Sequence, residues 1–101
     1  MQKLALVMHS KDNVATAIAD IPGHTKVAID NDGALREIET VQPIPFGHKF
    51  ALNDIVSGDI IMKYGEIIGV ASKAIKVGEH VHTHNVESRR GRGDLTVEKR
   101  G

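Results

Sequence analysis

The 101-residue sequence contains no cysteine and no tryptophan, and it has only two Phe and one Tyr. Without cysteine, the chain cannot form a disulfide, a thiolate metal site or a cysteine nucleophile, so any metal must use imidazole, carboxylate or carbonyl ligands. Three aromatic rings are too few for the stacking platform that binds single-stranded nucleic acid. These absences exclude thiol chemistry and argue against single-strand recognition.

The sequence also lacks a net charge and a long apolar run. Its 13 Lys and Arg balance 13 Asp and Glu before the six His are counted, which argues against general attraction to nucleic acid or to an anionic membrane. The longest apolar stretch, residues 4–8, is too short for a membrane span or for the core of a signal peptide. We therefore expect one globular, cytoplasmic domain.

The aliphatic residues favour β-structure. Val and Ile number 10 and 11, whereas Leu numbers 5, and branching at Cβ suits a pleated strand better than a helix. The pattern predicts strands over residues 4–8, 25–30, 35–41, 49–52, 60–63, 67–71 and 80–86. We expect a mainly β domain with one short helix, which Asp12 caps and which ends at residue 19.

Turn signals separate these strands. Asn31-Asp32-Gly33 predicts a tight hairpin, because Asp-Gly supplies the positive φ that such a turn needs. One phrase recurs three times, as an Ile, two residues, a Gly and a polar residue, starting at Ile44, Ile55 and Ile75. Each copy is predicted to bury its Ile and to turn at its Gly, which indicates a compact fold of short strands and tight corners.

Three histidines alternate in the segment Gly78-Glu79-His80-Val81-His82-Thr83-His84-Asn85. On a straight strand, His80, His82 and His84 would share one face, with neighbours about 6.6 Å apart. The pair His82 and His84 is the predicted metal site, and His48, Asp12 or a partner chain could supply further ligands. The alternative is that the three imidazoles form a polar, solvated strand face.

Other polar residues stand at predicted turns. Lys49 and Lys63 are candidates for binding a substrate carboxylate, and Tyr64 follows Lys63 directly. His48 is a candidate for proton transfer near neutral pH. Residues 88–101 carry five Lys and Arg against two acidic residues, which predicts a flexible basic tail that is solvated or docks onto another subunit, with RNA binding as an alternative.

Four linked motifs in residues 4–85 resemble one known family. They are Asp12-Asn13-Val14, Ile44-Pro45-Phe46-Gly47-His48-Lys49, Lys63-Tyr64-Gly65-Glu66 with Ile68-Gly69, and the histidine segment 78–85. In order, spacing and residue type they are similar to the N-terminal SAF domain of the altronate and galactarate dehydratases. The resemblance implies a β-clip fold for residues 1–87.

The resemblance also implies an activity. The family eliminates water from six-carbon sugar acids to give 2-keto-3-deoxy acids and depends on iron(II) or manganese(II), and a related branch releases sulfite from sulfolactate. Because single-chain members continue into a larger catalytic region, this chain looks like a separately encoded small subunit with a large partner. We also expect its exposed strand edges to favour self-association.

By resemblance, each motif receives a role. His82 and His84 are assigned as contacts to the metal or the substrate. His48 and Lys49 are assigned to catalysis, His48 as proton carrier or further metal ligand and Lys49 as carboxylate binder. The substrate contacts are assigned to six further residues: Lys63, Tyr64, His80, Asn85, Asp12 and Asn13. The alternative function is a stand-alone, non-catalytic SAF module that binds a metal or a small carboxylate.

Overall fold

The computed structural model describes residues 3–31 and 33–88, and within these ranges the chain forms nine strands and no helix. The strands are β1 (Ala5–Leu6), β2 (Val14–Ala17), β3 (Lys26–Asn31), β4 (Ala34–Glu39), β5 (Lys49–Ala51), β6 (Ile60–Lys63), β7 (Glu66–Ala71), β8 (His80–Val81) and β9 (Val86–Glu87). The prediction of a mainly β domain is therefore confirmed. A search of the same residues for a helix that could cross a membrane finds none.

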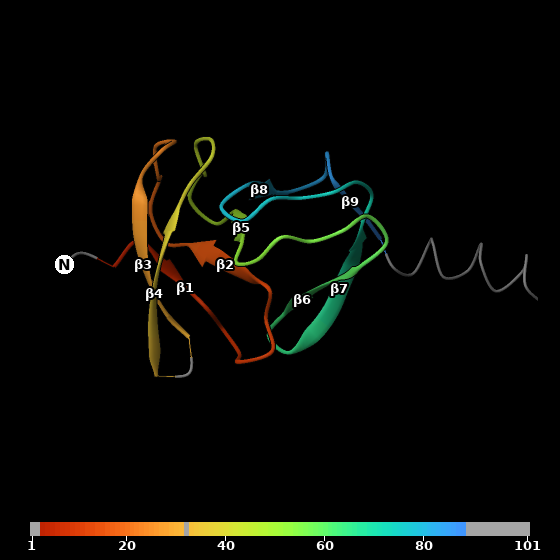
Figure 1. Ribbon diagram of the computed structural model, residues 1–101, viewed down its shortest axis with the longest axis horizontal. Coiled ribbons are helices and arrows are strands. Elements are labelled where there is room, and N and C mark those ends of the chain that lie inside the picture. Colours follow the sequence, from red (N-terminus) through yellow and green to blue (C-terminus); the bar gives the residue numbers. More distant parts are fainter. Residues whose placement is uncertain (1–2, 32, 89–101) are drawn as a thin grey trace, which may run out of the picture.

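The strands form three antiparallel sheets. The central sheet has the order β1-β2-β5-β8, the hairpin β3–β4 stands alone, and the third sheet has the order β6-β7-β9. Figure 1 shows the β3–β4 hairpin and the β6–β7 hairpin on opposite sides of β1, β2 and β5. The central sheet thus connects two outer hairpins.

Two hydrophobic clusters lie on the two faces of the central sheet. Along β5, Phe50 contacts the first cluster and Ala51 contacts the second, as the alternation of a strand requires. The first cluster also takes side chains from β3 and β4, and the second takes side chains from β6 and β7. Each outer hairpin therefore covers its own core.

The short helix predicted to follow Asp12 is wrong, because β2 occupies that part of the chain. All four residues of β2 are buried, since β1 and β5 flank the strand and each face contacts a different cluster. A strand held between two cores requires small side chains, which Ala15 and Ala17 provide. Tertiary packing here overrides the helix propensity of alanine.

The recurring phrase behaves as predicted and has a fourth copy. Its three isoleucines are buried, and its three glycines, Gly47, Gly58 and Gly78, have φ values of 84°, 95° and 85°. The fourth copy begins at Ile21, where His24 takes the glycine position with a φ of 57°. The four isoleucines pair through two antiparallel bridges, Ile21 with Ile44 and Ile55 with Ile75.

The predicted hairpin around Gly33 is also confirmed, since β3 and β4 pair in register and Gly33 has a φ of 86°. The single strand predicted for residues 80–86 is wrong. The chain leaves the central sheet after Val81, turns, and resumes as β9 in the third sheet. The predicted basic tail lies outside the described residues except for Ser88.

Candidate metal centre

Three histidines meet where β5 and β8 pair. The register places Lys49 opposite Val81 and Phe50 opposite His80. Continuing this antiparallel register by one residue places His48 opposite His82, and the alternation of a strand puts His80 on the same face. The pairing of two strands that are far apart in sequence therefore brings the three imidazoles together.

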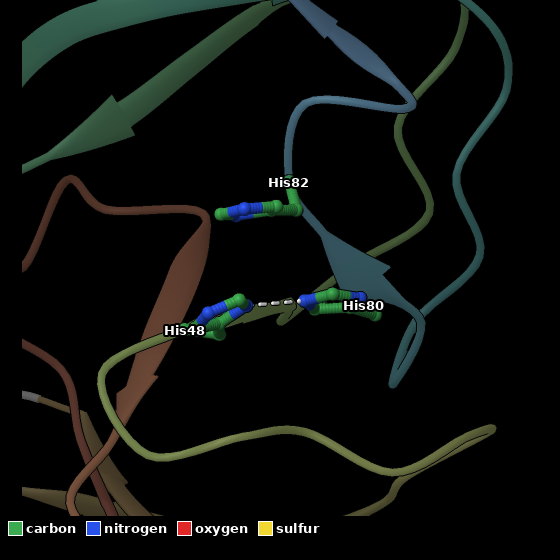
Figure 2. A group of neighbouring side chains, drawn as sticks. All are labelled: His48, His80 and His82. Carbon is green, nitrogen blue, oxygen red and sulfur yellow. Dashed lines mark hydrogen bonds between the residues drawn. The ribbon is translucent and has the colours of Figure 1, made fainter.

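The three rings lie nearly parallel and close together (Figure 2). The ring centroids of His48 and His82 are 4.1 Å apart, and those of His48 and His80 are 5.1 Å apart. One ring nitrogen from each histidine lies within 4.8 Å of the others, and all three side chains are partly exposed. We call His48, His80 and His82 the histidine cluster.

A hydrogen bond of 2.9 Å joins His48 Nδ1 and His80 Nε2 inside the histidine cluster. One of these two nitrogens must carry the proton and the other must offer its lone pair. An ion that bound both nitrogens would replace that shared proton. The same bond shows that the two side chains already point toward one another.

His84 lies outside this group of three. It is exposed in the turn that follows β8, and its ring centroid is 5.3 Å from that of His80. The geometry therefore groups His82 with His48 and His80, in place of the predicted pair His82 and His84. The prediction assumed a straight strand through residue 84, but the strand ends at Val81.

The surroundings of the histidine cluster favour uncharged imidazoles. Burial, followed by the neighbouring imidazoles and Lys49, lowers the pKa of His80 from 6.5 to about 4. Burial also lowers the pKa of His82, with additional contributions from His48 and Lys49. A neutral imidazole is the form that binds a metal ion, so the lowered pKa values of His80 and His82 favour metal binding over protonation.

Two lysines add positive charge beside the histidine cluster. Lys49 is half-buried, and burial followed by the charge of Lys63 lowers the pKa of its ammonium group. The Nζ atom of Lys63 lies 5.3 Å from the centre of the Tyr64 ring, which is within the range of a cation–π contact. An anionic ligand would relieve the repulsion between the two ammonium groups.

Asp12 and Asn13 hold the turn that carries Lys63 and Tyr64. The Asp12 carboxylate accepts hydrogen bonds from the backbone N–H groups of Tyr64 and Gly65, at 3.0 and 2.8 Å. Asn13 pairs with the edge of β6, because its Oδ1 accepts from Met62 N and its Nδ2 donates to the Ile60 carbonyl. These backbone partners favour a positioning role for both residues over contact with substrate.

Two side chains fix the backbone of the histidine cluster. Asn85 is fully buried and hydrogen-bonds to the backbone of both His80 and His82. Gln42, which the sequence did not single out, accepts a 2.7 Å hydrogen bond from the His80 N–H. Gln42 lies two residues before a bridge isoleucine, and no local pattern marks it as a partner of β8.

Comparison with known proteins gives a family match. Residues 3–89 match the family described as altronate/galactarate dehydratase SAF domain. An altronate dehydratase from Escherichia coli K12 is 43% identical over 81 residues, which cover 80% of this chain and 16% of the relative. The chain thus spans about one sixth of the length of that enzyme.

Shorter relatives also match. A (2R)-sulfolactate sulfo-lyase subunit alpha from Chromohalobacter salexigens is 40% identical over 62 residues, covering 61% of this chain and 65% of the relative. The same subunit from Paracoccus pantotrophus is 49% identical over 47 residues, covering 46% of this chain and 70% of the relative. The matched sequence therefore occurs both inside long dehydratases and in a short lyase subunit.

Proposed function

Because the chain belongs to the altronate/galactarate dehydratase SAF domain family, we propose that it is the small subunit of a metal-dependent lyase. The substrate is an anionic hydroxy acid, either a sugar acid that loses water or sulfolactate that loses sulfite. Relatives whose names include "dehydratase" and "sulfo-lyase subunit alpha" support both leaving groups. The activity requires a larger partner subunit, which supplies the rest of the active site.

The observation that carries the proposal is the convergence of three imidazole nitrogens within 4.8 Å of one another. Three protein ligands that leave further coordination positions open are typical of a catalytic metal site. Imidazole suits iron and zinc, whereas manganese is better matched by oxygen ligands. Of the two metals that the resemblance implies, the histidine cluster therefore favours iron(II).

The chemistry needs positive charge next to a carboxylate. Removal of the proton α to that carboxylate gives an enediolate-like dianion, and a bound divalent ion supplies charge stabilisation at its oxygens. Lys49 and Lys63 bind the substrate carboxylate as ammonium groups. With His48 assigned to the metal, proton transfer falls to another group, and His84 is the imidazole of this chain that lies beside the cluster.

The test is to purify the tagged, intact chain from an extract of its native cell and to assay the eluate anaerobically. The assay supplies iron(II) or manganese(II) with altronate, galactarate or (2R)-sulfolactate, and measures 2-keto acid and sulfite. We expect a larger subunit to co-purify and one of these substrates to react. His82→Gln should abolish most of the turnover, whereas His24→Asn, at an exposed turn, should leave it unchanged.

The alternative is a stand-alone SAF module that binds a metal or a small carboxylate without catalysis. Recovery of the chain alone, with no turnover on any of the three acids under metal-replete conditions, would contradict the lyase proposal and favour this module. Binding of iron(II) by that solitary chain, lost in His82→Gln, would then define what the module recognises.

A further inference from the structure

Asn85 is a fully buried polar side chain whose carbonyl oxygen and amino group both form hydrogen bonds. Its Oδ1 accepts a 3.0 Å hydrogen bond from the His82 N–H, and its Nδ2 donates a 2.8 Å hydrogen bond to the His80 carbonyl. Burying an amide without such partners would cost free energy, so the two bonds account for its presence in the interior. One side chain therefore contacts the backbone of two members of the histidine cluster.

The backbone of Asn85 ties the same turn to another sheet. Its N–H donates to the His82 carbonyl at 3.2 Å, and its carbonyl accepts from the Ser72 N–H at 2.9 Å. Ser72 directly follows β7, which is packed in the third sheet. Asn85 therefore connects the end of a well-paired strand to the turn that presents His82.

We infer that Asn85 is a positioning residue, which holds His80 and His82 in the orientation that completes the histidine cluster. In the structure the chain turns after Val81, and the ring centroids of His80 and His82 lie 5.4 Å apart. The Asn85 side chain fixes the peptide groups on both sides of Val81, and so sets the directions in which the two imidazoles leave the backbone.

The chemistry of the position selects asparagine. One end must accept from an N–H while the other donates to a carbonyl, and the side chain must be short enough to stay inside its own turn. Alanine provides neither group, and serine is too short to reach both peptide groups at once. The part of the inference that concerns a metal rests on the proposed function, whereas the arrangement of the imidazoles is a property of the chain itself.

The experiment uses the intact chain and compares Asn85→Ala with Thr40→Ala. Thr40 is a matched control because it is also fully buried and hydrogen-bonds to backbone, accepting from Thr25 N and donating to the Pro22 carbonyl, neither of which belongs to the histidine cluster. Asn85→Ser is a milder variant in case Asn85→Ala does not fold. Nitrogen-15 NMR of the metal-free imidazoles is recorded first, followed by titration with cobalt(II) and its absorption spectrum.

In Asn85→Ala we expect the signature of the His48–His80 hydrogen bond to disappear and cobalt affinity to fall about tenfold or more. Thr40→Ala should keep both, and Asn85→Ser should lie between the two. If Asn85→Ala preserves the imidazole signals and the affinity, or if Thr40→Ala loses them equally, Asn85 does not position the cluster. If the wild-type chain binds no cobalt while the imidazole signals still depend on Asn85, the metal proposal fails and this inference stands.

Discussion

Two similar segments of the chain, residues 20–48 and 54–79, which we call its halves, share one plan but are followed by different strands. Each half opens with an Asp and a bridge isoleucine, continues through a hairpin, and returns to a second bridge isoleucine. In each half the opening carboxylate accepts a hydrogen bond from the N–H two residues beyond the second isoleucine. The pairs are Asp20 with Phe46 at 2.8 Å and Asp54 with Val77 at 2.9 Å.

The halves differ in the strand that follows the second bridge. After the first half, β5 lies between β2 and β8 and places Phe50 in a core. After the second half, β8 is an edge strand of two residues that gives way to the turn of His82 and His84. The same local plan therefore yields a covered strand in one half and an exposed strand end in the other, and the histidine cluster forms where they meet.

The largest expected effect comes from Gly78→Ala, which tests whether the second half tolerates a side chain at its turn. A Cβ at Gly78 would collide with the backbone carbonyl of Glu39, whereas a Cβ at Gly58 would meet open space. Both glycines have positive φ, so Gly58→Ala should cost about 1–2 kcal/mol of strain. Gly78→Ala should lower the free energy of unfolding, measured in urea, by about 3 kcal/mol or more. Equal losses in Gly58→Ala and Gly78→Ala would show that the close approach of Glu39 to Gly78 is unimportant.

The second prediction concerns acid stability of the chain with metal removed by a chelator. The pKa of His80 is about 4 in the folded state, below its ordinary value of 6.5, so the unfolded chain binds more protons between these pH values. The contribution of uncharged His80 to the free energy of unfolding is therefore fully present above pH 6.5, and it should be lost as the pH falls toward 4. In chemical unfolding at several pH values, the free energy of unfolding of His80→Gln should fall less steeply with decreasing pH than that of wild type. The same pH dependence in both proteins would contradict the lowered pKa of His80.

The third prediction compares the two opening carboxylates. Asp20→Ala and Asp54→Ala each remove one hydrogen bond between a carboxylate and a backbone N–H, in equivalent places of the two halves. Each should lower the free energy of unfolding by about 1 kcal/mol, because the bonds are exposed to solvent. Thermal unfolding of the two variants side by side measures these stability losses. A large loss for only one variant would show that the two hydrogen bonds do not contribute equally to stability.

The smallest effect is expected at the position where the first half departs from the pattern. His24 has a φ of 57° where the other three copies have glycine, and its Nδ1 lies 3.8 Å from a Glu39 carboxylate oxygen in an exposed contact of little stabilising value. His24→Gly should therefore stabilise the chain by about 0.5 kcal/mol, after the greater flexibility of glycine in the unfolded state is counted. A loss of stability measured by the same unfolding experiment would mean that the contact with Glu39 outweighs the backbone strain at His24.

Much of the architecture could be predicted from local signals. Strand-forming residues, the Asp-Gly turn and the recurring Ile and Gly positions each act through neighbours in sequence, and the strands and corners are found near the predicted places. One exception is the strand predicted for residues 80–86, which ends at Val81. The other is β2, where alanines that favour a helix in isolation lie between two cores. Such burial depends on the whole fold, and a local pattern does not report it.

The candidate site could be predicted only in part for the same reason. The sequence pointed to His48, His80 and His82, but it assigned them separate roles and paired His82 with His84. Their grouping follows from the register of β5 against β8, which joins segments about 30 residues apart. The turn that follows β8 also has a partner distant in sequence, because the Asn85 carbonyl accepts a hydrogen bond from Ser72 at the end of β7.

The most direct test of the account is metal binding by the three imidazoles at the junction of the two halves. Anaerobic titration of the intact chain with iron(II) or cobalt(II) should be compared between wild type, His48→Gln and His84→Gln. The account predicts that His48→Gln weakens binding strongly, whereas His84→Gln binds as wild type does. Loss of binding in His84→Gln with binding retained in His48→Gln would contradict the histidine cluster and restore the pair of His82 and His84.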